Sequence, residues 1–290
     1  MTRKDRAPKP EELQRVLNVS DLREATIVSM IALGGFREET LTRLRYRHVR
    51  EDLEANRTPI HVRIEIEITK GKYASYDTFL GAEAAEYLRV YLDTRRRGSP
   101  YTREGTPEIP PEEMSDESPL IRDSRSPTPK PVGSKQIRKL VHNLYVRAGL
   151  LQQKKPEPTS RPSYELKVHS LRKHFKTQME AAGVKTDYVE YMMGHKRDTY
   201  HDIESLGIDK LRNIYASANL SIRHRTSIAK LDLIREFAKN LGVNPENVHV
   251  EPDTKYVDPL DREKAEIRAY MTAIRDELRK PPMDAIPRNH

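Results

Sequence analysis

The sequence predicts an α+β protein that is mainly α-helical, with one small antiparallel β-hairpin and a C-terminal helical appendage. Apolar residues recur at helical spacing in several segments, which are residues 23–33, 36–44, 82–97, 134–149 and 208–220. By contrast, Ile60–Ile68 alternates apolar and polar residues without exception, and Tyr76–Leu80 provides a return strand after the turn at Thr69–Lys72. Two further apolar stripes, at residues 228–241 and 267–278, predict a terminal pair of amphipathic helices.

Composition restricts both the architecture and the chemistry. With 290 residues, 36% of them hydrophobic, the chain is long enough for one sizeable core and a small appendage, which we expect to be residues 1–225 and 226–290. The absence of Cys excludes disulfides, thiolate zinc sites and cysteine nucleophiles. No apolar run approaches the roughly 18 residues that span a bilayer, and the N-terminus lacks the apolar region of a signal peptide. We therefore expect a cytoplasmic protein that does not enter membranes.

The net charge of +8 and pI of about 9.4 make nucleic acid the natural partner. Residues 134–149 form a predicted basic helix, capped by Ser134 and closed by Gly149, whose cations either track a DNA backbone or form an ordinary solvated face. The candidate DNA-binding residues of the whole chain are Lys72, Lys135, Arg138, Lys139 and Lys173.

A change of composition marks residues 98–131, which contain eight of the chain's 20 Pro. Proline cannot continue a regular helix, so this stretch is predicted to be an exposed, partly flexible insertion. Within it, Ser118–Arg122 is predicted to be a short ordered piece before the next helix.

The residues best suited to chemistry lie in Lys167–Phe175 and the segment that follows. His169 and Arg172 are one helical turn apart, and together they offer a proton carrier and a forked donor to a phosphate. His195 follows a short helix, and Tyr200 is a potential nucleophile nearby. Taken alone, His169 and Arg172 also fit an ordinary basic helix surface. Taken alone, His195 also fits the polar residue next to a helix C-cap.

Two further cations are candidates. Arg37 follows Gly34-Gly35 at a predicted helix N-terminus, where backbone N–H groups and a guanidinium favour an anion, although a solvated Arg fits as well. Lys70 and Lys72 occupy the predicted hairpin tip, where lysines are ordinarily solvated.

The order of these motifs resembles the catalytic core of the tyrosine recombinases, the phage-type integrases, and particularly the archaeal branch carried by mobile elements such as viruses and plasmids. The resemblance rests on His169–Phe175, Glu180–Val184 and Val189–His195, and on Gly35-Phe-Arg37 with Leu44–Val49. It covers about residues 10–225, although Thr40 replaces the usual acid after the first Arg. The resemblance leaves out the helical domain that precedes the catalytic domain in most members, so we expect a fragment, a minimal recombinase or a relative that has changed role.

The resemblance implies a site-specific recombinase that cuts and rejoins double-stranded DNA through a 3′-phosphotyrosyl intermediate. Arg37 and Arg172 would stabilise the phosphate oxygens, Lys70 would protonate the leaving oxygen with Lys72 as its reserve, His169 would assist proton transfer and His195 would hold the phosphate. No metal or other cofactor is implied, and dimers or tetramers would assemble on DNA. The alternatives are a non-catalytic DNA-binding relative, a type IB topoisomerase-like enzyme and an unrelated helical RNA-binding protein.

The nucleophile remains open between two tyrosines. In the family it usually stands nine residues beyond the second His, where this chain has Glu204. Tyr200 lies between Thr199 and His201, a setting similar to that of the family, and it precedes a helix. Tyr215 is the alternative nucleophile, but its spacing from Leu211 and Ile214 also suits a packing role.

Overall fold

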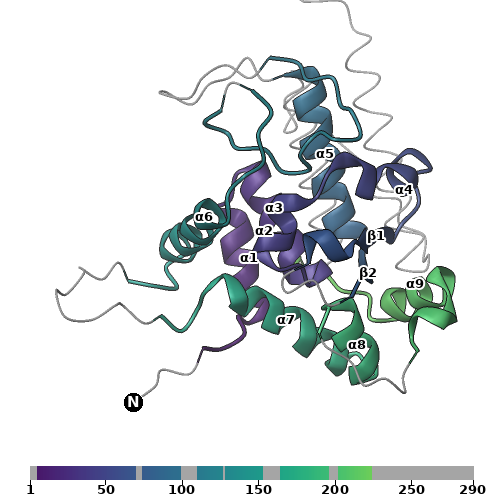
Figure 1. Cartoon of the computed structure of the whole chain (residues 1–290). Helices are drawn as coiled ribbons and strands as arrows, with labels where there is room; N and C mark the ends of the chain where they lie inside the picture. Colours follow the sequence, from purple (N-terminus) through teal and green to yellow (C-terminus); the bar gives the residue numbers. More distant parts are fainter. Residues whose placement is uncertain are drawn as a thin grey trace, which may run out of the picture. The chain divides into compact units, whose positions relative to one another are not determined.

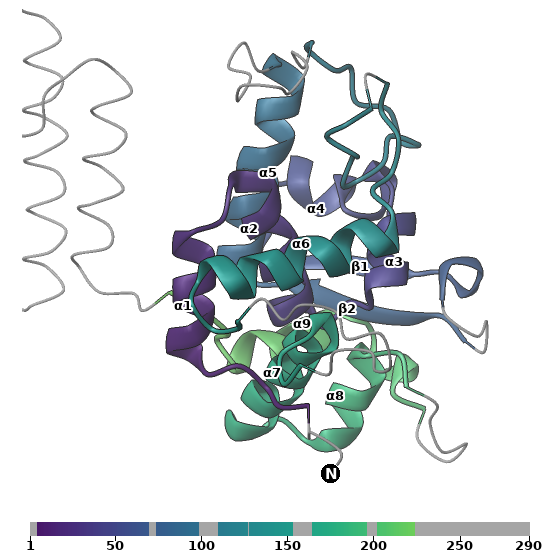
Figure 2. The ribbon, with the colours of Figure 1, turned by 90° about the vertical axis from the view of Figure 1, so that its left-hand side faces the viewer.

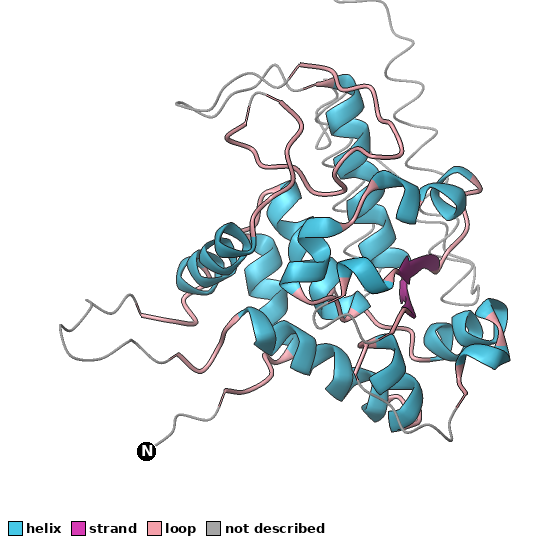
Figure 3. Ribbon diagram, in the orientation of Figure 1, coloured by secondary structure: helices cyan, strands magenta, loops and turns pink. Residues whose placement is uncertain are grey.

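The computed structural model describes residues 5–69, 74–98, 110–126, 128–152, 164–195 and 202–223, all within one compact unit, residues 1–223. These residues form mainly helices, with one two-stranded antiparallel sheet, which confirms the predicted fold class (Figures 1 and 3). The predicted C-terminal extension, residues 226–290, lies outside the described residues. In the part of the chain that the structure describes, no helix is both long and apolar enough to cross a bilayer.

Helix α2 (Leu22–Gly34) forms the centre of the core. The side chain of Asp21 accepts a hydrogen bond from the N–H of Glu24, while the Glu24 carboxylate accepts one from the N–H of Asp21, so a capping box begins the helix. Every residue from Ala25 to Gly34 is buried. A helix that is apolar on all sides must be covered on all sides, and α2 contacts helices α1 (Pro10–Asn18), α5 (Ala82–Arg97), α6 (Ser134–Arg147) and α7 (Val168–Ala181).

The ends of the predicted helices agree closely with the structure. Helix α5 spans the predicted residues 82–97, and α6 begins at the predicted Ser134, although Gly133 rather than Ser134 is its N-cap. The short helices α3 (Glu38–Arg43) and α8 (Thr186–Met192) carry the chain past the ends of α2 and α7. Figure 2 shows α7 and α8 together at one end of the described unit, with α5 towards the other.

The predicted first strand is too long. Strand β1 (Ile60–Ile64) pairs with β2 (Tyr76–Leu80), with Ile60 opposite Leu80 and Ile64 opposite Tyr76. Beyond Ile64 no residue of β2 remains to pair with, and Ile66–Ile68 forms a 3₁₀ turn. The alternating pattern therefore identified the hairpin correctly but not the end of its first strand.

The Pro-rich insertion was predicted to be exposed and partly flexible, but several of its residues are buried. Leu120 and Ile121 are buried in the core, and the guanidinium of Arg95, only 3% exposed, binds the carboxylate of Glu112 at 2.5 Å. Arg122 contacts the same carboxylate at 3.3 Å, and its N–H donates to the hydroxyl of Tyr91. The predicted ordered piece Ser118–Arg122 is confirmed, because α5 supplies both apolar surface and an ionic anchor for it.

The last described helix, α9 (Ile208–Ser217), is tied to the same unit by polar contacts. Arg212 donates to Asp52 of α4 (Arg50–Glu54) at 2.8 Å, and Glu204, shortly before α9, pairs with Arg63 of β1 at 2.6 Å. Residues 164–195 and residues 202–223 therefore pack on the same unit.

Candidate functional site

Two arginines from distant parts of the sequence meet at one backbone carbonyl. The Nη1 group of Arg37 donates to the carbonyl oxygens of Met193, at 3.0 Å, and Gly194, at 3.1 Å. Arg172 donates through Nη2 to the Met193 carbonyl at 3.1 Å and through Nη1 to that of Gly35 at 2.5 Å. The end of α2, the second turn of α7 and the end of α8 thus converge on the Met193 carbonyl.

Local sequence explains how each arginine reaches this point. Gly35, with φ of +69°, ends α2 in the left-handed conformation, and a Cβ there would lie 2.7 Å from the ring of Phe175. This turn brings Arg37 to the N-cap of α3. Arg172 lies on the buried side of α7 and is 2% exposed, whereas His169 lies at the surface. The predicted common face of His169 and Arg172 is therefore split between solvent and the interior.

The electrostatics of the pair favour an anion. Neither guanidinium forms an ion pair with a carboxylate of the described residues, and both use carbonyl oxygens instead. Burial, followed by the charge of Arg37, lowers the pKa of Arg172 to about 10. Arg172 therefore stays protonated at neutral pH, and two like charges lie together in a place where an anion would relieve their repulsion.

His195 joins the pair through the end of α8. The N–H of Gly194 donates to the carbonyl of Tyr191 and that of His195 to the carbonyl of Glu190, the two bonds of a Schellman motif. Gly194 has φ of +63°, and a Cβ there would lie 2.3 Å from the ring of Tyr76. This turn places the imidazole Nε2 3.1 Å from Nη2 of Arg172.

The other ring nitrogen of His195 has an acidic partner. Nδ1 contacts the carboxylate of Glu190, which also binds the ammonium of Lys176 on α7. The pKa of His195 is lowered, mainly by burial. The Glu190 carboxylate raises this pKa, whereas the charges of Arg172 and Arg37 lower it further. His195 is therefore mainly neutral at neutral pH in the free protein.

His169 is positioned at the start of α7, one turn before Arg172. Its ring forms no hydrogen bond with the part of the chain that the structure describes. Partial burial and the charge of Arg172 lower its pKa, so a neutral imidazole able to accept a proton is favoured at neutral pH. This state suits a general base.

Three of the predicted site residues, Lys70, Lys72 and Tyr200, lie outside the described residues. Tyr215, the alternative nucleophile, is buried and 1% exposed. Its hydroxyl donates to the carbonyl of Leu33 at 2.7 Å and accepts from the N–H of Gly81 at 3.0 Å, and burial raises its pKa. A buried hydroxyl held by two hydrogen bonds has a structural role. This argues against the alternative prediction that Tyr215 is the nucleophile.

The predicted DNA-binding residues fall into two groups. Lys135 and Lys139 are exposed on α6 and line a cavity of about 300 Å³, in which Asp123 accepts a hydrogen bond from Gln136. Arg138 instead pairs with Glu38 at 3.2 Å, and Lys173 pairs with Asp5 at 3.3 Å. Because α6 contacts α3, whose N-cap is Arg37, the exposed lysines lie on an element next to the arginine pair.

Glu190 and Tyr76 contact the site but were not among the residues predicted from the sequence. A sequence signal for Glu190 was available, since it stands five residues before His195, which follows the helix-ending Gly194. In a Schellman motif the residues at these two positions commonly contact each other. Tyr76 had no comparable signal, since its contact with Gly194 crosses from β2 to α8. Next to it, Asp77 binds the hydroxyl of Tyr191 and His61 Nε2, the latter at 2.8 Å, which joins the hairpin to α8.

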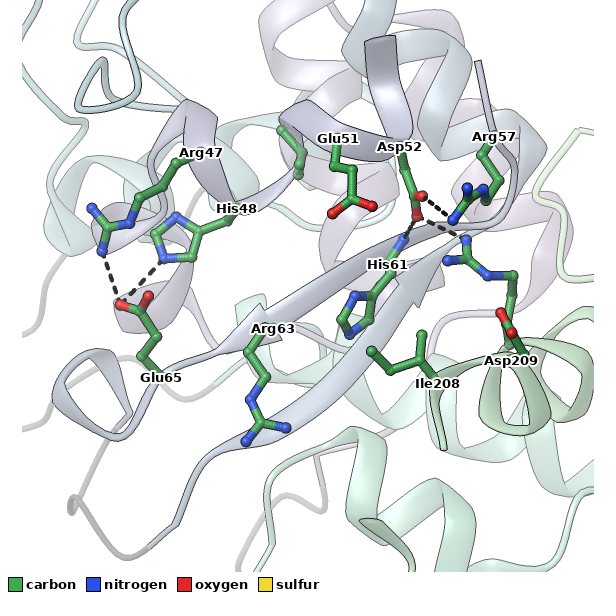
Figure 4. Close-up of a pocket in the computed structure, with 12 residues that line it drawn as sticks. Arg47, His48, Glu51, Asp52, Arg57, His61, Arg63, Glu65, Ile208 and Asp209 are labelled. Carbon is green, nitrogen blue, oxygen red and sulfur yellow. Dashed lines mark hydrogen bonds and ion pairs between the residues drawn. The ribbon is translucent and has the colours of Figure 1, made fainter. Parts of the chain in front are cut away.

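A larger cavity of about 450 Å³ lies elsewhere, beside the outer side of β1 (Figure 4). It is lined by four arginines and two histidines, but also by four carboxylates, which are Glu51, Asp52, Glu65 and Asp209. Figure 4 shows the Glu65 carboxylate in contact with both Arg47 and His48, and Asp52 beside Arg57. Its charges are largely compensated internally, so this cavity is less suited to an anion than the site of Arg37 and Arg172.

Among the residues that the structure describes, no group of three or more His, Asp or Glu side chains is arranged to hold a metal ion. The described site has the guanidinium groups of Arg37 and Arg172 at the Met193 carbonyl, the imidazole of His195 beside Arg172, and that of His169 one turn earlier on α7.

Comparison with known proteins identifies the family of this chain. Residues 9–202 match the model of the phage integrase family. No curated protein matches the chain. Similar solved structures include XerA recombinase, with 20% identity over 82% of this chain and 66% of that chain and a TM-score of 0.47. Another is the integrase from mycobacterium phage Brujita, with 18% identity over 78% of this chain and 62% of that chain and a TM-score of 0.48.

A λ integrase fragment, solved as a dimer bound to a core site, shares 14% identity over 69% of this chain and 61% of that chain, with a TM-score of 0.43. The chain thus spans less than two thirds of each of these three proteins. The family model covers well over half of this chain, including Arg37, His169, Arg172 and His195. The chain therefore belongs to the phage integrase family.

Proposed function

We propose that this chain is a site-specific tyrosine recombinase that cuts and rejoins double-stranded DNA. The observation that carries the proposal is the meeting of Arg37 and Arg172 at the Met193 carbonyl, with His195 Nε2 3.1 Å from Arg172. Preorganised donors without carboxylate partners are the means by which a protein stabilises charge that develops on phosphate oxygens. Membership of the phage integrase family supports the same reading.

In the proposed reaction, the Tyr200 oxygen attacks the phosphorus in line and the bond from phosphorus to the 5′ oxygen breaks. The hydroxyl proton of Tyr200 passes to His169, and Lys70 supplies a proton to the leaving 5′ oxygen. The product is a 3′-phosphotyrosyl bond and a free 5′ hydroxyl. Attack by a 5′ hydroxyl on the same phosphorus reverses these steps and rejoins the strand.

Tyr200 is the better candidate nucleophile because both hydrogen bonds of the Tyr215 hydroxyl hold it inside the core. Tyr200 follows the site residue His195 by five positions in the sequence. We further propose that double-stranded DNA is the partner, contacted in part by Lys135 and Lys139, and that the protein assembles on it as a dimer or tetramer. An origin in an archaeal mobile element and a cytoplasmic location complete the proposal.

Trapping of a covalent adduct tests the function. The protein is incubated with nicked duplexes that carry candidate sites. Cleavage next to the nick releases a short strand that diffuses away, so the strand cannot be rejoined. The retained adducts are detected by denaturing electrophoresis. Wild-type protein is expected to form an adduct and Tyr200→Phe none. Arg37→Ala is expected to reduce its rate by about 10²–10³, as loss of one transition-state donor does.

Arg43→Ala is the matched control, because Arg43 is an exposed arginine on α3, close to Arg37 in the sequence. It should form the adduct at the wild-type rate. DNA binding without an adduct on any substrate would identify a non-catalytic relative. Relaxation of supercoiled DNA by an adduct-forming protein that never exchanges strands would identify a topoisomerase-like enzyme.

A further inference from the structure

The contacts of His195 determine which of its nitrogens carries the proton. A guanidinium has donors and no acceptor, so His195 Nε2, 3.1 Å from Nη2 of Arg172, must present its lone pair. The proton of the neutral ring then lies on Nδ1, where it is donated to the Glu190 carboxylate. A carboxylate that accepts from one ring nitrogen commonly selects a histidine tautomer in this way.

This tautomer does not suit a phosphate. The oxygens of a phosphodiester accept hydrogen bonds and cannot donate them, so a lone pair on Nε2 would face them unfavourably. His195 can donate to such an oxygen only if Nε2 gains a proton. The required proton comes from solvent, and it leaves either an imidazolium beside the Glu190 carboxylate or a proton shared between the two groups. Both outcomes take up one proton in total.

We propose that Glu190 is a positioning residue, which holds His195 as the Nδ1–H tautomer in the free protein and supports the uptake of a proton at Nε2 when a DNA phosphate binds. The inference rests on the proposed binding of DNA phosphate at this site. Its basis is the geometry of two elements: Glu190 and His195 are fixed by the Schellman turn of α8, and Arg172 is fixed by its carbonyl contacts from α7.

The charged surroundings give the direction of the coupling. Burial, Arg172 and Arg37 lower the pKa of His195, and the carboxylate of Glu190 raises it. Lys176 from α7 binds that carboxylate, and Tyr76 of β2 lies buried against Gly194. A phosphate placed between the arginines and His195 would screen the positive charges of Arg172 and Arg37. The pKa of His195 would therefore rise.

Proton uptake on binding means that DNA affinity falls as pH rises between the pKa of His195 in the free protein and its higher pKa in the complex. One proton per site corresponds to about a tenfold rise in Kd per pH unit inside that window. Glu190→Gln keeps an acceptor for Nδ1–H but removes the negative charge. This variant should lower the pKa of His195 in both states and flatten the dependence of Kd on pH near neutrality.

The test uses the full chain with Tyr200→Phe, which blocks chemistry, and a short synthetic duplex of fixed sequence as the probe. Nitrogen chemical shifts of the His195 ring are followed by NMR against pH, with and without the duplex, and Kd is measured in parallel. We expect Nδ1–H in the free protein and a higher pKa of His195 with DNA. Glu190→Gln should give a lower pKa of His195 both with and without the duplex, and Glu190→Asp should restore part of the wild-type value.

Glu180→Gln is the matched control, because Glu180 pairs with the same Lys176, at 3.8 Å, and has no contact with His195. It should leave the titration of His195 unchanged. The proposal is overturned if the free ring carries its proton on Nε2, if DNA leaves the pKa of His195 unchanged, or if Glu180→Gln and Glu190→Gln behave alike. Failure of the proposed function would appear separately, as the absence of an adduct with Tyr200 intact.

Discussion

At the scale of single residues, the hydroxyl of Tyr215 joins three parts of the chain. It lies on α9, donates to the carbonyl of Leu33 near the end of α2, and accepts from the N–H of Gly81 just before α5. Its removal leaves a buried N–H and a buried carbonyl without this partner. Residues with such contacts are needed for stability, whereas a nucleophile must leave its contacts to react.

The substitution Tyr215→Phe is therefore expected to lower the free energy of unfolding by about 1–3 kcal/mol, the usual cost of an unsatisfied buried polar group. Covalent adduct formation should persist at temperatures well below the midpoint of unfolding. Tyr200→Phe provides the comparison, with the adduct lost and the melting temperature unchanged. An adduct that disappears with Tyr215→Phe in folded protein would reverse the two roles.

At the scale of elements, the turn that ends α8 must stay in the left-handed conformation to present His195. Gly194→Ala adds the cost of a positive φ for a residue with a side chain, about 1–2 kcal/mol, and a methyl group that meets the ring of Tyr76. We expect an additional loss of about 1–3 kcal/mol from this crowding, and lower activity because His195 shifts with the turn.

Gly183→Ala separates these two contributions. Gly183 has φ of +86°, and a Cβ there would meet nothing within 4 Å. Chemical denaturation of both variants should show the smaller loss for Gly183→Ala, with wild-type adduct formation. Equal losses at the two positions would show that the contact with Tyr76 carries no cost.

The buried ion pairs of the Pro-rich insertion give a second prediction at this scale. Glu112, 8% exposed, binds both Arg95 and Arg122, so Glu112→Gln leaves two buried guanidinium groups without their carboxylate. Breaking a buried ion pair by removing one partner costs about 3–5 kcal/mol. Thermal unfolding should detect this loss, while Glu113→Gln, at the exposed neighbouring position, should match wild type. A similar melting temperature for both variants would mean that the insertion does not depend on this anchor.

At the scale of the whole molecule, a net charge of +8 predicts that DNA binding depends steeply on salt. The logarithm of the affinity should fall by about 0.9 per neutralised phosphate for each tenfold rise in salt concentration. The double variant Lys135→Ala/Lys139→Ala should reduce this slope by about 1–2, measured by fluorescence anisotropy. Arg138→Ala should change it less, because Glu38 already pairs with that arginine. A slope that does not depend on these lysines would place the DNA on another surface.

Several features were predictable because they depend on neighbours in the sequence. The apolar spacing of α2 and α5, the existence of the hairpin, and the glycines that end helices are local properties. The order of Arg37, His169, Arg172 and His195 likewise indicated the phage integrase family, which the family model confirms. Local rules work here because hydrogen bonds within a helix or turn join residues only a few positions apart.

Tertiary structure alone decided the features that depend on contacts between distant segments. The first strand ends at Ile64 because β2 offers no partner beyond Tyr76, and the Glu112 side chain is buried because Arg95 of α5 pairs with it. Arg172 is buried because it donates hydrogen bonds to the carbonyls of Gly35 and Met193. His169 makes no such contact and remains at the surface. Burial and long-range hydrogen bonds are set by which surfaces meet, and sequence spacing carries no information about that meeting.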